Sequence, residues 1–212
     1  MIKGIIFDFW GTLVENGVFP SPVRQVRFML NLRIPFSEFI VKFEESFMMS
    51  EPESLTEAFT NVCKVFNIEP KKEIIENLVG MWNKNMLLAK PYPETIETLE
   101  RLKKDYKIGL ISNTDKFSLE PLLEKFGLDK YFDYTALSYK MTMLKTNPKM
   151  FEDVLSNLGI SKEEAIMVGD SMETDIKGAI NAGVKPILID RRNVRTYENK
   201  IRDLKEIDKF LK

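Results

Sequence analysis

Residues 2–13 read IKGIIFDFWGTL. The apolar, β-branched run from Ile2 to Phe9 predicts a buried strand, and the Gly11-Thr12 pair that follows predicts a turn. The strand therefore presents the carboxylate of Asp8 near its carboxyl end. Because ligands bind outside the carboxyl ends of the strands in open α/β sheets, Asp8 is the first candidate functional residue.

Four further segments repeat this pattern of an apolar run that ends at a polar group. They are Lys107–Ile111 before Ser112, Tyr134–Leu137 before Ser138, Ala165–Val168 before Gly169-Asp170, and Lys185–Ile189 before Asp190. Helical patterns lie between them at Pro93–Lys104, Leu119–Phe126, Pro148–Leu158 and Thr174–Ala182. Strands that alternate with helices predict an α/β fold, in which helices cover both faces of a Rossmann-like parallel sheet.

The stretch from about Pro20 to Ala89 breaks this alternation. Its apolar residues follow the helical period in four segments, Ser21–Leu32, Ser37–Met48, Leu55–Phe66 and Lys71–Leu88. We therefore expect an all-helical cap domain over residues 17–89, inserted into a core domain made of residues 1–16 and 90–212. Asn16-Gly17 and residues 90–93 are the expected hinges, because Gly loosens the chain and Pro ends a helix.

The composition narrows the chemistry that the chain can perform. It has 212 residues, with 31 basic and 32 acidic side chains and no histidine. No imidazole can therefore serve as a base, an acid or a metal ligand. The single cysteine, Cys63, excludes an intrachain disulfide and an iron–sulfur cluster. The chemistry that remains uses carboxylates, lysine, hydroxyl groups and hard metal ions.

The charge balance and the hydropathy pattern also limit the partners. The net charge is −1, which argues against a basic surface of the kind that binds phosphate backbones, so we expect no nucleic-acid partner. No segment approaches the ~18–20 apolar residues of a membrane-spanning helix, and the N-terminus lacks the features of a signal peptide. We expect a cytoplasmic protein without a membrane partner, either a monomer or a homodimer.

Four groups of residues follow one another along the chain. They are Asp8-Phe9-Trp10-Gly11-Thr12-Leu13, Leu110-Ile111-Ser112-Asn113-Thr114, Lys145 ahead of Pro148, and Val168-Gly169-Asp170-Ser171 with Asp175 further on. A polar residue of any one group alone could equally be a turn or a helix cap. In this order the groups resemble the four motifs of the haloacid dehalogenase superfamily, and the resemblance spans nearly the whole chain.

The resemblance implies a hydrolase with a mobile helical cap and with Asp8 as its nucleophile. A carboxylate that attacks phosphorus or carbon forms an ester, which water later cleaves. Lys145 would neutralise developing charge and keep Asp8 ionised, and Thr12 and Ser112 would orient the transferred group. The candidate catalytic residues are Asp8, Thr12, Ser112, Asn113 and Lys145, and the candidate substrate-binding residues of the core are Gly11 and Thr114.

The same resemblance implies a Mg²⁺ site. Two ionised carboxylates that converge, here Asp8 and Asp170, repel each other unless a cation lies between them. Mg²⁺ takes oxygen ligands. By resemblance these ligands are Asp8, the backbone carbonyl of Trp10, and Asp170. Asp175 would support these ligands or replace one of them, and its alternative interpretation is an acid in the first turn of a helix.

Trp10 departs from the family pattern, because phosphatases of the family usually carry an aspartate there that protonates the leaving group. An indole cannot release a proton near neutral pH. The aromatic residue is similar to haloacid dehalogenases, whereas Asp170 is typical of Mg²⁺-dependent enzymes. We predict a phosphatase that acts on a small phosphorylated metabolite or on a phosphate with a good leaving group. The alternatives are a 2-haloacid dehalogenase-type C–halogen hydrolase, and a binding or regulatory protein with residual activity.

The expected cap carries two arginines of interest. Arg24 and Arg27 lie on its first expected helix and could reach a small anionic substrate, with a solvated helix face as the alternative for both. The cap is also rich in Phe and Met. This composition favours packing between the helices, and an apolar substrate slot or a dimer surface are the alternatives.

Overall fold

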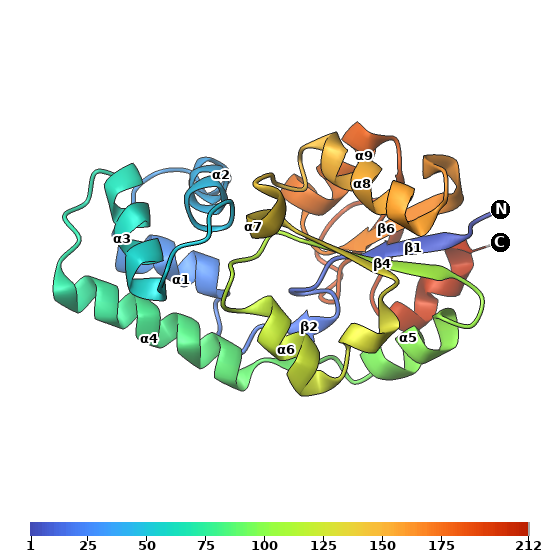
Figure 1. Cartoon of the computed structure of the whole chain (residues 1–212), viewed down its shortest axis with the longest axis horizontal. Helices are drawn as coiled ribbons and strands as arrows, with labels where there is room; N and C mark the ends of the chain where they lie inside the picture. The colour runs from blue at the N-terminus through green and yellow to red at the C-terminus, as the bar shows by residue number, and fades with distance from the viewer. Residues whose placement is uncertain (212) are drawn as a thin grey trace.

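A six-stranded parallel sheet organises most of the chain (Figure 1), and the computed structural model describes residues 1–211. The strand order is β5-β4-β1-β6-β7-β8, and every pair in it is parallel. The strands are β1 (Gly4–Phe7), β4 (Lys107–Ser112), β5 (Tyr134–Leu137), β6 (Ala165–Gly169), β7 (Lys185–Ile189) and β8 (Lys200–Ile201). This arrangement confirms the α/β class with a Rossmann-like sheet.

Helices cover both faces of the sheet because successive side chains of a strand point to opposite sides. On β1, Ile5 and Phe7 belong to one hydrophobic cluster and Ile6 belongs to another. The first cluster packs under α5 (Thr95–Leu102) and α6 (Leu119–Phe126), and the second packs under α8 (Pro148–Leu158) and α9 (Lys177–Ala182). The sheet is therefore the middle layer of three.

Residues between β2 and β3 form a separate layer of four helices, at the left of Figure 1. Its helices are α1 (Pro22–Met29), α2 (Phe36–Phe47), α3 (Leu55–Val65) and α4 (Lys72–Leu88). Aromatic rings fill its interior: the ring of Phe47 lies 4.7 Å from that of Phe59 and 4.8 Å from that of Trp82, centroid to centroid. The contact between Phe47 and Trp82 is edge-on, and aromatic pairs of this kind stabilise a core beyond the area they bury.

A two-stranded antiparallel ribbon joins the helical layer to the sheet. Its strands are β2 (Val14–Glu15) and β3 (Lys90–Pro91), with Val14 opposite Pro91. Gly17 packs against the end of α4, where a Cβ atom on it would lie 2.3 Å from the carbonyl oxygen of Asn85. The second expected hinge, residues 90–93, thus begins in a strand that pairs with the residues just before the first expected hinge, Asn16-Gly17, and the sequence did not predict this pairing.

One expected helix differs from the structure. The helix expected over Thr174–Ala182 begins with a π-helical turn, Met172–Ile176, before α9. Near the C-terminus, Leu204–Phe210 forms a 3-10 helix, and Lys212 lies outside the described residues. Shorter elements are α7 (Ser138–Met141) and the 3-10 turns Asp129–Tyr131 and Lys162–Glu164. Within residues 1–211 no helix combines the length and the apolar character that crossing a membrane requires.

Candidate active site

The carboxyl ends of the three central strands bring the expected site residues together. Asp8 follows β1, Ser112 ends β4, and Asp170 follows β6. Because β1 lies between β4 and β6, with Phe7 opposite both Leu110 and Val168, these ends converge on one edge of the sheet. Residues more than 100 positions apart therefore meet there, as the motif order predicts.

Asp8 is buried and held at both carboxylate oxygens. Its Oδ1 lies 2.6 Å from Nζ of Lys145, and its Oδ2 accepts a hydrogen bond from Oγ1 of Thr12 at 2.9 Å. Burial raises the pKa of Asp8 to about 6, and the charge of Asp175 adds to this rise, whereas Lys145 and Thr12 oppose it. The carboxylate is thus oriented by its neighbours and is ionised at neutral pH.

Lys145 bridges two buried carboxylates. Its Nζ lies 2.6 Å from Asp8 and 2.5 Å from Oδ1 of Asp175, and its backbone N–H donates to Oδ1 of Asn113 at 2.9 Å. Burial alone would lower the pKa of Lys145, but the charges of Asp175 and Asp8 outweigh it and raise the pKa above its usual range. The amine is therefore a fixed positive charge beside the nucleophile.

Asp175 belongs to the π-helical turn after β6 and is fully enclosed. Its Oδ1 pairs with Lys145, and its Oδ2 accepts the backbone N–H of Ser171 at 2.9 Å. The close approach requires Gly169, since a Cβ atom at that position would lie 2.3 Å from the Asp175 carboxyl group. Both oxygens of Asp175 have partners in the chain, so its position is that of a support for Lys145 and for the turn.

Three carboxylates form a cluster that could hold a metal ion. Ligand oxygens of Asp8, Asp170 and Asp175 lie within 4.8 Å of one another. Burial, and then the charges of Asp8 and Asp175, raise the pKa of Asp170 well above its usual value. Three carboxyl groups face the single amine of Lys145, which leaves an excess of negative charge that a hard divalent cation would balance.

Gly11 makes room for this cluster. Its φ is +81°, and a Cβ atom on it would lie 2.5 Å from Oδ2 of Asp170. Only glycine adopts this backbone conformation readily, and only a residue without a side chain leaves space for the carboxylate. Gly11 is a candidate substrate-binding residue, and in this structure it lies against the carboxyl group of Asp170. The space that Gly11 leaves lets Asp170 join the carboxylate cluster, whose oxygen atoms suit Mg²⁺.

A cavity of about 370 Å³ lies between the sheet edge and the helical layer. Residues at the strand ends form one of its walls, and residues of the helical layer form the other. A volume of this size accommodates a small ligand. The sheet side contributes Asp8, Trp10, Asn113, Thr114, Lys145 and Asp170, and the helical layer contributes Arg24, Phe36, Ile40, Glu44, Met48, Trp82 and Asn85. Charged groups thus dominate one wall, and helix faces form the other.

Ser112 and Thr114 behave differently. The hydroxyl of Ser112 is buried and, within the described part of the chain, has no hydrogen-bond partner. Thr114 lines the cavity, and its backbone N–H donates to Oγ of Ser138 at 2.9 Å. An unpartnered buried hydroxyl costs free energy unless a ligand or water satisfies it, which is consistent with the expected role of Ser112 toward a transferred group.

Trp82 makes a polar contact between the helical layer and the core beside the cavity. The indole N–H of Trp82, on α4, points to Oδ2 of Asp115 at 3.2 Å and to Oγ of Ser118 at 3.0 Å. All three side chains are buried. The helical layer is therefore anchored to the loop that carries the second motif.

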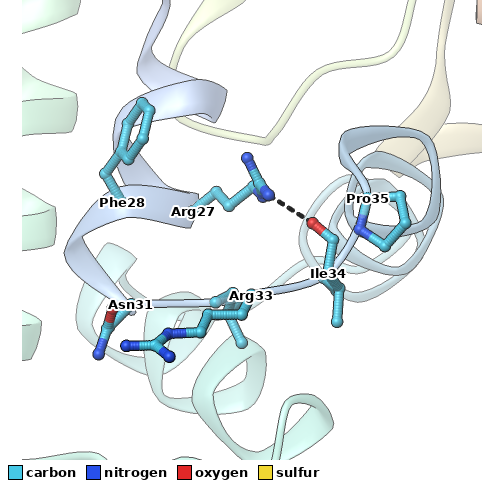
Figure 2. Close-up of a pocket in the computed structure, with 7 residues that line it drawn as sticks. Arg27, Phe28, Asn31, Arg33, Ile34 and Pro35 are labelled. Atoms are coloured by element: carbon cyan, nitrogen blue, oxygen red, sulfur yellow. Dashed lines mark hydrogen bonds between the residues drawn. The ribbon is translucent and has the colours of Figure 1, made fainter.

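The two candidate arginines of α1 lie in different places. Arg24 lines the active-site cavity, and its guanidinium stacks on the ring of Phe36 at 4.3 Å. Figure 2 shows Arg27 in a separate surface cavity, where its Nη2 donates to the carbonyl oxygen of Ile34 at 2.5 Å. The expectation that Arg27 contacts substrate is not supported, because its side chain ties α1 to the loop before α2.

Two residues outside the motifs complete the site. Glu44 of α2 is buried at the cavity wall, where its Oε2 accepts a hydrogen bond from Nδ2 of Asn113 at 2.9 Å. Arg191 donates to the carbonyl oxygen of Thr12 at 2.7 Å and pairs with Glu94, which holds the loop after β1. The helical spacing of Phe36, Ile40 and Glu44 is a signal that could have placed Glu44 on the cavity face. Arg191 lies in the basic run that follows β7, and this position after a strand end is the signal that marks it.

The family model of haloacid dehalogenase-like hydrolases matches residues 2–183, so the chain belongs to this family. Among curated relatives, it is 29% identical over 200 residues to a glyceraldehyde 3-phosphate phosphatase of Methanothermobacter thermautotrophicus, covering 89% of this chain and 86% of the relative. It is 28% identical to the protein of the same name from Methanocaldococcus jannaschii, covering 100% and 99%. The family expected from the four motifs is confirmed.

Solved structures agree with this assignment. A haloacid dehalogenase-type phosphatase from Thermococcus onnurineus superposes with a TM-score of 0.64 at 28% identity, covering 99% of this chain and 98% of that one. A 2-haloacid dehalogenase from Pseudomonas syringae superposes with a TM-score of 0.66 at 18% identity, covering 99% and 97%. The second likeness concerns the fold alone, so the fold is shared by enzymes of different chemistry.

Proposed function

We propose that this protein is a Mg²⁺-dependent phosphatase that hydrolyses a small phosphorylated metabolite through a phosphoryl ester of Asp8. The observation that carries the proposal is the placement of the Asp8 carboxylate between Lys145 and Thr12, beside Asp170, at the wall of a cavity. The phosphatase names of relatives that match nearly the full chain support the same activity.

The residues divide the work of phosphoryl transfer. Asp8 attacks phosphorus and displaces the leaving group, and water then cleaves the resulting ester. The amine of Lys145 takes up negative charge on the transferring group and keeps Asp8 ionised. Thr12 orients the Asp8 carboxylate, and the unpartnered hydroxyl of Ser112, which is buried directly before the cavity-lining Asn113, would reach a phosphoryl oxygen seated deep in the site. Asn113 holds the backbone of Lys145 in place.

The metal would be held by Asp8, Asp170 and the backbone carbonyl of Trp10. Bound Mg²⁺ would supply positive charge to the oxygens of the transferring phosphoryl group. Asp175 supports this site through Lys145 and the Ser171 backbone. The excess of carboxylates over amines in the cluster is the feature that supports a cation here.

Residues 17–89 act, in this proposal, as a cap domain over a core domain of residues 1–16 and 90–212. The shared aromatic interior of α1–α4 and the narrow β2–β3 ribbon support this division. A cap that closes over a bound substrate excludes water from the first chemical step. The substrate is a small anion, since the cavity measures about 370 Å³ and opens beside Arg24 and Lys145.

The C–halogen alternative is less well supported. The carboxylate of a haloacid would have to enter a cavity that already holds Asp8, Asp170 and Glu44. A phosphate brings the same repulsion, but its metal counter-ion balances it. A purely binding role would leave the Asp8–Lys145 pair without a function.

Phosphate release from p-nitrophenyl phosphate and acetyl phosphate tests the proposal. Both substrates have good leaving groups. We expect release with Mg²⁺, none with EDTA, and none from Asp8→Asn under either condition. Equal release by the wild type and Asp8→Asn would contradict the proposal, and halide release from 2-chloropropionate would favour the dehalogenase instead.

A further inference from the structure

The site lacks a proton donor at the position two residues after the nucleophile. Trp10 stands two residues after Asp8, and its indole cannot exchange a proton near neutral pH. A phosphate ester of an ordinary alcohol has a strongly basic leaving oxygen, and general acid catalysis accelerates its departure by about 10²–10⁴-fold. An acid from another part of the chain would have to fill this role.

The direction of attack defines where such an acid must lie. In phosphoryl transfer the attacking and leaving oxygens are roughly in line on opposite sides of phosphorus. Asp8 approaches from the sheet side of the cavity. The leaving oxygen therefore faces the helical layer, which is the opposite wall.

Glu44 is the carboxyl group on that wall. It is 8% exposed, lies on α2 and lines the cavity with Phe36 and Met48. Its Oε2 accepts the Asn113 amide, and within residues 1–211 its Oε1 has no hydrogen-bond partner. Because Glu44 lines the cavity, a carboxyl oxygen that has no partner in the protein is available to a ligand or to water there.

We propose that Glu44 is the general acid and general base of this active site, in place of the missing aspartate. The inference rests on the proposed phosphatase activity. In the first step the Asp8–phosphorus bond forms, the bond to the leaving oxygen breaks, and protonated Glu44 gives its proton to that oxygen. In the second step Glu44 takes a proton from water, the oxygen of that water bonds to phosphorus, and Asp8 and inorganic phosphate are released.

One carboxyl group can serve both steps, because the attacking water takes the place of the departed leaving group. The amide of Asn113 links the two halves of the site, since it donates to Glu44 and accepts from the backbone of Lys145. Asn113 thereby fixes the position of Glu44 relative to Lys145, the residue that contacts Asp8. Through this amide, a side chain on a helix of the helical layer is held beside the reacting groups.

The surroundings of Glu44 allow both its protonated and its ionised form near neutral pH. Burial raises the pKa of Glu44 to about 7, and the charges of Asp175 and Asp8 add to the rise. The charge of Lys145 and the Asn113 hydrogen bond oppose it. A group that titrates near neutral pH can both give and accept a proton at the working pH.

The test compares Glu44→Gln with Glu45→Gln, which changes the exposed neighbour on the same helix. Both variants and the wild type are assayed in Mg²⁺ on para-substituted phenyl phosphates, from p-nitrophenyl to p-methoxyphenyl. Glutamine has the size of glutamate and retains an acceptor for Asn113, so the cavity is preserved. The readouts are kcat and kcat/KM, each plotted against the pKa of the leaving phenol, and the pre-steady-state release of p-nitrophenol.

We expect the loss of kcat/KM in Glu44→Gln to grow with the basicity of the leaving group, from within about twofold for p-nitrophenyl phosphate to roughly tenfold or more for the p-methoxy compound. With p-nitrophenyl phosphate the variant should show a burst of product followed by a lower kcat, because water attack lacks its base. Glu45→Gln should follow the wild type. A merely structural role for Glu44 would lower all substrates alike.

Parallel leaving-group plots for the wild type and Glu44→Gln, without a burst, would overturn the role of Glu44 while leaving the phosphatase intact. A wild type that shows no release above Asp8→Asn for any of these substrates would instead overturn the phosphatase proposal, and the role of Glu44 with it.

Discussion

The two walls of the active-site cavity are built on different principles. On the sheet side, the charged groups are paired, although the buried hydroxyl of Ser112 has no partner among the described residues: Asp8 pairs with Lys145 and Thr12, and Asp175 pairs with Lys145 and a backbone amide. On the helical side, Glu44 has one hydrogen bond, and the side-chain oxygen of Asn85 is buried without a partner among the described residues. The sheet wall is preorganised for a fixed reaction, whereas the helical wall retains unused acceptors for a ligand.

The comparison extends to how each wall is supported. The ends of β1, β4 and β6 are fixed by the sheet register, so the charged groups on them have little freedom. The helical wall rests on stacked rings such as Phe43 on Phe47, with centroids 5.1 Å apart. The nucleophile and its charged partners thus stand on or beside strand ends, whereas the proposed acid, Glu44, stands on a layer that packs around its own aromatic interior.

Removing the amine of the sheet wall should have the largest effect. Lys145→Met leaves Asp8 and Asp175 buried without a counter-charge, and we expect the free energy of unfolding to fall by about 3–5 kcal/mol. Phosphatase activity should fall by about 10³-fold. Urea denaturation in EDTA measures the first and p-nitrophenyl phosphate hydrolysis the second. The control is Lys149→Met, an exposed lysine nearby, and equal stability of the two variants would contradict the preorganised wall.

The acid of the helical wall should make the stability depend on pH. The pKa of Glu44 is about 7 in the folded protein against an ordinary 4.5, so the folded state binds the proton more tightly. The free energy of unfolding therefore falls as pH rises between these values. From pH 5 to pH 8 the wild type should lose roughly 2–3 kcal/mol relative to Glu44→Gln, measured by denaturation in EDTA.

Glu45→Gln is the matched control for this pH dependence and should behave as the wild type does. If Glu44→Gln and the wild type differ by a constant amount at both pH values, Glu44 is not titrating in that interval.

The contact between the walls can be weakened at Trp82. Trp82→Phe removes the indole N–H that points to Asp115 and Ser118, and should lower the free energy of unfolding by about 1–3 kcal/mol. Ser118→Ala removes one acceptor, so a double-mutant cycle isolates the contact, with an expected coupling of about 0.5–1.5 kcal/mol. Additive effects would show that the hydrogen bond from Trp82 to Ser118 contributes nothing measurable, and would leave packing and the contact with Asp115 as the role of Trp82.

The smallest expected effect lies at the edge of the helical wall. Arg24 lines the cavity and Arg27 does not, although both belong to α1. Arg24→Ala should raise KM for an anionic substrate by roughly two- to fivefold, because the arginine is exposed and solvent screens its charge. Arg27→Ala should leave KM unchanged. A larger change in KM at Arg27 would mean that the substrate reaches the second cavity.

The sequence predicted the sheet side of this comparison well. Helices α6 and α8 have the expected bounds, because Gly127 and Gly159 end them in the left-handed conformation and Pro148 begins α8. Strands β5 and β7 also match, since each is an apolar run bounded by polar residues. Asp8 and Asp170 lie close together because parallel strands place their carboxyl ends together, and Lys145 reaches Asp8 from the loop before α8.

The helical side could not be predicted to the same depth. Periodicity indicates which face of α2 is buried but not whether the buried face meets another helix or a cavity, so Glu44 was missed, and the sequence did not separate Arg27, which lies outside the active-site cavity, from Arg24. The β2–β3 ribbon has two residues in each strand, which is too short for a periodic signal. Its pairing depends on chain segments that are distant in the sequence.

That ribbon also has a mechanical consequence. The segments that lead into and out of α1–α4, β2 and β3, pair with each other, and Gly17 after β2 packs against the end of α4. The two connections therefore act as a single hinge. Any swing of the helical layer would carry Glu44 and Asn85 together. The proposed proton donor and the unpartnered amide oxygen of Asn85 would then approach and leave the sheet wall together, so proton transfer would be timed with the entry of solvent.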